Sequence, residues 1–132
     1  MANEALIRER LDDPIDFVVA DGAGIEKGTI CILTDPRTAA ASSTTAQVFA
    51  GVAAREKIIN DGRTRLALFR RGVFDMTCNH GTGITAGEWV ATSGANLIRT
   101  ATAAEVAVGK GIGIALETAS ADEVIQVMAG GF

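Results

Sequence analysis

Residues 48–74 read VFAGVAAREKIINDGRTRLALFRRGVF, and this stretch decides the fold class. Short apolar runs over 48–54, 63–69 and 72–77 are separated by polar connections, a pattern typical of β-strands rather than helices. Asp61-Gly62 supplies the glycine that a tight turn with positive φ requires. The stretch therefore predicts consecutive strands joined by turns.

The same pattern extends to both sides of this stretch. Residues 38–46 consist mainly of Thr, Ala and Ser without periodicity, which predicts a surface loop. The Ala-rich residues 100–108 are expected to form a short helix. The chain is therefore expected to be all-β, with at most one or two short helices and with further strands over 16–20, 29–34, 88–92, 111–117 and 123–128.

The first sixteen residues differ in composition from the rest, because they are rich in charged residues. Pro14 follows an Asp pair and disfavours helical dihedrals at Asp13, so any helix should stop before it. We interpret residues 1–16 as an N-terminal arm attached to a β domain over 17–132. A short solvated helix is the alternative for the arm.

Three landmarks of the first half recur in order in the second half. They are Ile25-Glu-Lys-Gly28 with Ile84-Thr-Ala-Gly87 at an offset of 59, Gly51-Val-Ala with Gly113-Ile-Ala at 62, and Gly72-Val-Phe with Gly130-Gly-Phe at 58. A duplicated β-unit closed into one barrel is the economical interpretation; the alternative is that such short patterns are common in Gly- and Ala-rich β chains. Gly51 and Gly113 would then begin strands at points of close backbone approach.

Composition limits the function classes. The chain has 132 residues, 48% of them hydrophobic, which suits one folded domain. No apolar run is long enough to cross a membrane, and the N-terminus does not resemble a secretory leader. A net charge of −4 argues against direct nucleic-acid binding. Cys31 and Cys78 are expected to be small core residues in a reducing compartment.

Motifs for catalysis or cofactors are weak. Lys27-Gly28-Thr29 has the wrong order for a phosphate loop and leads into a strand. His80 is the one histidine of the chain, so neither a zinc site nor a catalytic triad is easily built around it. We therefore expect no enzyme, cofactor or metal. The enzymatic alternative rests on Cys78 and His80 with Asp75, and it predicts a bound metal or a reactive thiol.

The charge distribution is more informative. Residues 55–71 hold six of the twelve basic residues and two acidic ones, so the segment is +4 and the remainder −8; the six are Arg55, Lys57, Arg63, Arg65, Arg70 and Arg71. A solvated hairpin is the common explanation. A basic hairpin on an acidic body also suits a symmetric oligomer, in which each subunit presents its basic stripe to a neighbour's acidic surface. Nucleic-acid contact is the third option, weakened because the chain has no Tyr and only 5% aromatic residues for base stacking.

The stretch over 48–74 resembles the head-decoration, or capsid cement, proteins of tailed viruses, the lambda-like ones among them. It has their Gly-[Val/Ile]-Ala strand at Gly51, the Thr-x-Leu-x-Leu-Phe strand from Thr64, a charged pair and then Gly-x-Phe. The resemblance implies a small β-barrel or β-tulip domain, with partners and sites to match. The implied partner is the major capsid protein, and the protein would form a homotrimer on the shell. The implied binding site is the N-terminal arm, which would add a strand to a capsid sheet, with Ile7, Leu11 and Ile15 as its apolar anchors.

The expected function is non-enzymatic capsid decoration. The protein would be made in the host cytoplasm, bind the outer surface of an expanded icosahedral virion shell, and bridge major capsid subunits. The alternative is a small β-barrel module that recognises a host glycan or protein. Removal of residues 1–16 would distinguish the two, because only the cement activity depends on the arm.

Overall fold

A computed structural model describes residues 3–79 and 81–130. The elements, in chain order, are β1 (Leu6–Arg10), β2 (Ile15–Val18), β3 (Ile30–Asp35), β4 (Thr38–Ala41), β5 (Phe49–Ala53), β6 (Arg65–Phe69), β7 (Gly72–Cys78), β8 (Trp89–Thr92), β9 (Leu97–Thr100), α1 (Ala103–Ala107), β10 (Gly113–Ala115) and β11 (Val124–Ala129). The prediction of an all-β chain with a short helix is confirmed. Within these ranges, no helix has the length and apolar character needed to span a membrane.

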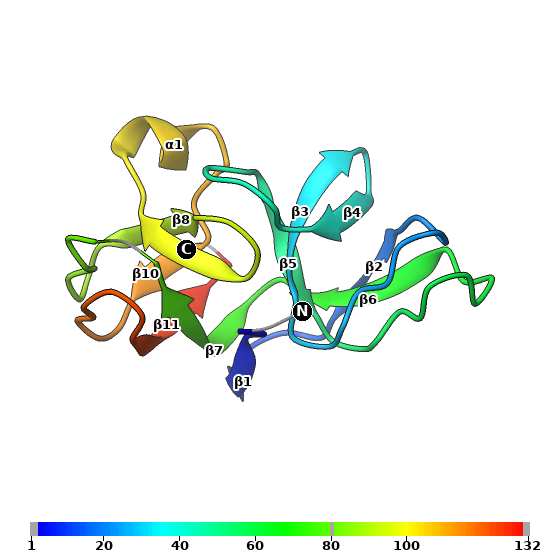
Figure 1. Cartoon of the computed structure of the whole chain (residues 1–132), viewed down its shortest axis with the longest axis horizontal. Coiled ribbons are helices and arrows are strands. Elements are labelled where there is room, and N and C mark those ends of the chain that lie inside the picture. The colour runs from blue at the N-terminus through cyan, green and yellow to red at the C-terminus, as the bar shows by residue number, and fades with distance from the viewer. Residues whose placement is uncertain (1–2, 80, 131–132) are drawn as a thin grey trace.

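The strands form two five-stranded barrels side by side (Figure 1). The first barrel closes in the order β2-β4-β3-β5-β6. The second closes in the order β7-β11-β10-β8-β9, and β1 pairs with residues 72–75 of β7, on the edge where Thr77 and Cys78 pair with β9. In each barrel one parallel pair, β2 with β4 and β7 with β9, completes an otherwise antiparallel ring.

The two barrels repeat each other residue by residue. Cys31 pairs with Gly51 in the first barrel, and Val90 pairs with Gly113 in the second. These pairs correspond at offsets of 59 and 62, the two offsets found at the first two sequence landmarks. The third landmark is wrong, because Gly72 opens β7 whereas Gly130 follows the end of β11. The expected single barrel is also wrong: each unit closes on itself because its own parallel pair joins the ends of its sheet.

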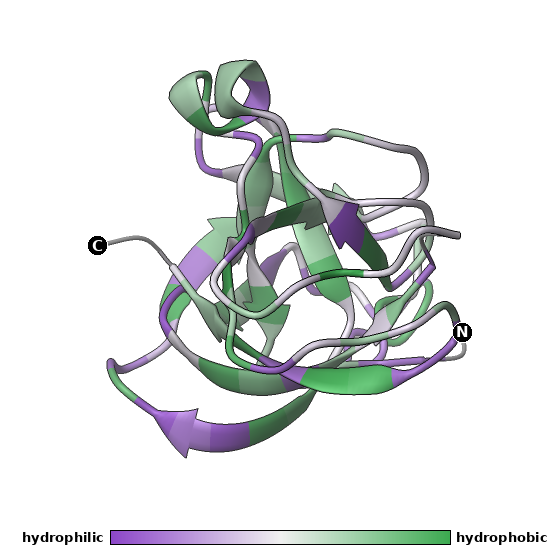
Figure 2. Cartoon of the chain, turned by 90° about the vertical axis from the view of Figure 1, so that its left-hand side faces the viewer, coloured by the Kyte–Doolittle hydropathy of each residue, from purple (hydrophilic) through white to green (hydrophobic). Residues whose placement is uncertain are grey.

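The barrels are joined through strand β5, which is buried along its whole length. Ala50 and Ala53 point into the first barrel, whereas Phe49 and Val52 pack with the core of the second. Successive side chains of a strand point to opposite faces, and a register shift between Phe49 and Gly51 brings Phe49 to the same side as Val52, so β5 contributes to both cores. A polar contact adds to the junction, since the Asn96 side chain accepts a 2.8 Å hydrogen bond from the Ile30 backbone N–H. Figure 2 shows the hydrophobic segments concentrated in the strands.

Three strands lie outside the sequence predictions, namely β1, β4 and β9. The predicted loop over 38–46 contains β4, which pairs with β3 and buries Ala39. Alanine has low strand propensity, so tertiary pairing decides this segment. Strand β9 was not predicted either. The helix expected over 100–108 is confirmed as α1, and Thr102 with Glu105 forms its capping box.

Strand β1 and the start of β2 lie within the first sixteen residues. Strand β1 pairs antiparallel with β7, with Ile7 opposite Phe74, so the alternative of a short solvated helix is wrong. Ala5, just before β1, is buried in the core of the second barrel. Strand β2 begins at Ile15, inside the predicted arm. The N-terminal segment is therefore held to the second barrel by the pairing of β1 with β7, in addition to its covalent connection to β2.

Candidate functional site

The basic segment forms the hairpin of β5 and β6 and the connection to β7. Ala53 pairs with Leu68, and the residues between the two strands make a long loop at one end of the molecule (Figure 1). Arg55, Arg63 and Arg65 are exposed, and among the described residues none of them has an ion-pair partner. These three guanidinium groups are available to an external partner.

Lys57 is not available, which corrects its assignment as a contact residue. Its side chain is 1% exposed, and its ammonium lies 2.7 Å from Asp61 Oδ1 and 2.9 Å from Asp21 Oδ1. It also donates to the carbonyl oxygens of Ile58 at 2.6 Å and of Asp21 at 3.3 Å. Burial acts against the charged form, but the hydrogen bonds that the ammonium donates to Asp61 and Asp21, with the attraction of the two carboxylates, outweigh it and raise the pKa of Lys57. The charged ammonium group of Lys57 therefore holds its own loop together.

The carboxylates that hold basic groups should make the protein sensitive to acid. The hydrogen bond from Lys57, with one from the Arg63 N–H, lowers the pKa of Asp61 to about 2. The Arg99 guanidinium and the Thr102 N–H likewise lower the pKa of Glu105 to about 2. Because both folded-state pKa values lie below the ordinary values of 3.8 and 4.5, this stabilisation is complete above about pH 4.5 and is lost as the pH falls toward 2.

We therefore expect the melting temperature to fall as the pH is lowered from 5 to 2, measured by circular dichroism at constant ionic strength. The fall should be smaller in Asp61→Asn, which cannot lose a charge on acidification. A melting temperature that is flat over this range in the parent protein would contradict the role of these carboxylates.

The remaining two arginines of the segment lie at the junction of the barrels. Arg70 is half-buried, and its guanidinium lies 5.0 Å from the ring centroid of Phe49, a cation–π contact. Arg71 forms an exposed ion pair with Asp12 at 2.9 Å. Both are engaged within the chain and are weaker candidates for an external contact than Arg55, Arg63 and Arg65.

The three predicted anchors of the arm do not share one environment. Ile7 is half-buried and packs against the core of the second barrel. Leu11 and Ile15 are 45% and 44% exposed. Leu6, which sequence reasoning missed, is 57% exposed on β1. The exposed apolar residues of this region are thus Leu6, Leu11 and Ile15.

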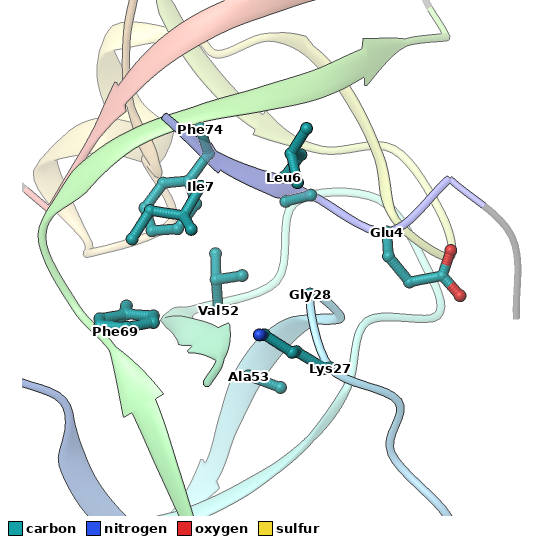
Figure 3. A pocket seen from close by; sticks show the side chains of 10 residues that line it. Glu4, Leu6, Ile7, Lys27, Gly28, Val52, Ala53, Phe69 and Phe74 are labelled. Atoms are coloured by element: carbon teal, nitrogen blue, oxygen red, sulfur yellow. The ribbon is translucent and has the colours of Figure 1, made fainter. Parts of the chain in front are cut away.

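A pocket of about 330 Å³ lies between β1 and the junction of the two barrels (Figure 3). Leu6, Ile7, Val52, Phe69 and Phe74 give it an apolar lining.

The loop of the basic hairpin also exposes two neighbouring apolar side chains that sequence reasoning did not single out. Ile58 and Ile59 are 59% and 56% exposed. The sequence signal for them is a pair of isoleucines within an otherwise polar turn. Exposed apolar residues next to unpaired arginines are typical of a protein-binding surface.

Two residues of the enzymatic alternative, Cys78 and Asp75, lie in the described part of the chain. Cys78 is fully buried, and Asp75 lies 3.7 Å from the Arg8 guanidinium. His80 lies outside the described residues. Burial raises the pKa of the Cys31 thiol to about 12, so this cysteine is not a nucleophile at neutral pH. Over residues 3–79 and 81–130, no group of three potential metal ligands comes together.

The described residues thus form two fused barrels with an added edge strand, and they expose apolar side chains near arginines that have no ion-pair partner among these residues. The family of phage cement proteins matches residues 10–131 of the chain, and the protein belongs to that family. A search of curated proteins found no match. The sequence resemblance to capsid cement proteins is confirmed, and membership assigns the chain a cement role on the virion capsid.

Proposed function

We propose that the protein is a non-enzymatic decoration protein that binds the outer surface of an expanded shell and stabilises it by bridging major capsid subunits as a homotrimer. It would be made in the host cytoplasm and added to the shell from outside. The observation that carries the proposal is the family match over nearly the whole chain.

The exposed arm supports this proposal locally. Strand β1 lies at the end of its sheet, and within residues 3–79 and 81–130 it pairs with β7 and no other strand, which leaves its second edge for another strand. Leu11 and Ile15 follow it and are exposed. An open strand edge beside apolar side chains suits binding by β-augmentation.

Substitutions test this site better than removal of residues 1–16, because removal would also take away Ala5 and Ile7 from the core. The double variant Leu11→Ser with Ile15→Ser should bind expanded empty heads at least tenfold more weakly than the parent protein. Co-sedimentation with expanded and unexpanded heads of the encoding virus measures this. Val108→Ser, which removes a 62% exposed side chain beside α1, is the matched control.

Binding of the parent to neither form of the heads would overturn the shell-binding proposal and favour the alternative, a module for a host glycan or protein. Equal binding of the parent and the double variant would leave the cement role intact but exclude Leu11 and Ile15 as its anchors.

A further inference from the structure

The duplication provides an internal comparison, because the same backbone occurs twice with different side chains. The β5–β6 hairpin of the first barrel corresponds to the β10–β11 hairpin of the second. Their turns match: the Asp61 N–H donates to Ile58 O at 3.3 Å, and the Glu123 N–H donates to Ser120 O at 3.2 Å. Ile58 and Ile59, which correspond to Ser120 and Ala121, are therefore not required by the backbone of this four-residue turn.

The two hairpins carry opposite charge. Residues 55–65 contain four basic and two acidic residues, whereas 117–124 contain three acidic residues and no basic one. Arg55 corresponds to Glu117, and the first hairpin has three additional residues that include Arg63. The whole barrels follow the same trend, since residues 15–71 hold eight basic and six acidic residues and residues 72–132 hold two and six.

Both hairpins also expose apolar side chains next to their charges. The first exposes Ile58 and Ile59, at positions where the second has Ser120 and Ala121. The second exposes Leu116 and Val124, at 43% and 60%. We define the basic tip as Arg55, Ile58, Ile59, Arg63 and Arg65, and the acidic tip as Leu116, Glu117, Asp122, Glu123 and Val124.

The two tips lie at opposite ends of the long axis of the molecule (Figure 1). One copy therefore cannot bring its own tips together, whereas two copies in line can. Asp21 and Asp61 are both engaged by Lys57, and the described part of the chain gives Arg55, Arg63 and Arg65 no ion-pair partner, so these arginines can take one from another copy. Lys57 also fixes the loop to Ile58 O, which lowers the entropy lost when the tip is bound.

We infer that the protein self-associates head to tail, with the basic tip of one copy docked against the acidic tip of the next copy. Opposite charges and apolar side chains meet in this contact, and its two surfaces are different, so it is heterologous and closes into a ring when the rotation between copies allows. The inference deepens the proposed homotrimer and does not depend on shell binding.

A charge exchange tests the contact in the full chain. Arg55→Glu and Glu117→Arg should each weaken self-association at least tenfold, measured by analytical ultracentrifugation at low salt. The variant carrying both changes should recover most of the parent's association, because the opposite charges again face each other between copies. High salt should weaken association of the parent, since exposed charges are screened.

A separate double variant tests the apolar side chains of the basic tip. Ile58→Ser with Ile59→Ala gives the first turn the residues that the second turn already has, so the melting temperature should remain that of the parent. Association should nevertheless weaken, whereas Val108→Ser, which changes an exposed side chain outside both tips, should associate like the parent.

Several outcomes would overturn the inference. A parent that stays monomeric at all concentrations and salts would do so, as would a double charge variant no better than the single ones. Loss of head binding by Arg55→Glu with unchanged self-association would instead place the basic tip on the shell. A parent that self-associates but binds no heads would refute the cement proposal and leave the head-to-tail contact standing.

Discussion

Gly113→Val should yield little folded protein, and Gly51→Val, its counterpart in the first barrel, should be strongly destabilised. A Cβ on Gly51 would lie 2.7 Å from the carbonyl oxygen of Phe69 and 2.9 Å from Leu68 Cβ. At Gly113 the carbonyl of Met128 is closer still, and Ala129 Cα lies at 2.8 Å. Such backbone atoms can move only if the hairpin pairing opens.

The milder substitutions should rank in the same order. We expect Gly51→Ala to lower the free energy of unfolding by about 3 kcal/mol, near the upper end for overpacking, and Gly113→Ala to lower it by more. Denaturant unfolding measures both. Gly22→Ala is the control, because a Cβ there would have no atom within 4 Å. Stabilities of Gly113→Ala and Gly22→Ala that agree with the parent's would contradict the close approach of β10 and β11.

Lys57→Met should be the most damaging substitution of a charged side chain. It removes the cation that Asp21, Asp61 and the Ile58 carbonyl surround and leaves two carboxylates facing each other. Breaking a buried ion pair from one side leaves an uncompensated charge, so the melting temperature should fall by roughly 10 °C or more. Lys27→Met, at an exposed position, should change it little.

The cause of that loss can be isolated. Combining Lys57→Met with Asp21→Asn and Asp61→Asn removes the whole charged cluster, and it should recover part of the lost stability because no buried charge is then left unpaired. A triple variant less stable than Lys57→Met would show that the carboxylates stabilise the loop without the lysine.

The strands between residues 48 and 78 could be predicted because their apolar runs and turn glycines agree with the final pairing. Strand β4 could not, since its Thr-Ala-Ala-Ala sequence has no strand pattern of its own and is fixed by its neighbour β3. The internal repeat could be recognised in the sequence at two landmarks, but the sequence did not show that each repeat closes into its own barrel. Barrel closure depends on the parallel pairs β2–β4 and β7–β9, which local patterns do not reveal.

The candidate contacts were predicted less well than the fold. The basic segment is correct as a hairpin, but a charge count cannot distinguish Lys57, buried against Asp21 from 36 residues earlier, from the exposed Arg55 beside it. Ile7 and Leu11 look alike in sequence, and their exposures differ because Ile7 faces the core of the second barrel. In both comparisons, the exposure of a side chain depends on whether it points toward a part of the fold that is distant in sequence.

The position of β1 also matters for the order in which the chain is made. Strands β1 to β6 leave the ribosome before the second barrel exists, and β7 follows only a few residues after β6. The final neighbours β9 and β11 begin at Leu97 and Val124, so at roughly 5–20 residues per second β11 arrives seconds later. During that interval β1 is already available to cover one edge of β7. A nascent strand that would otherwise be open to pairing with other chains thus has a partner as soon as it emerges.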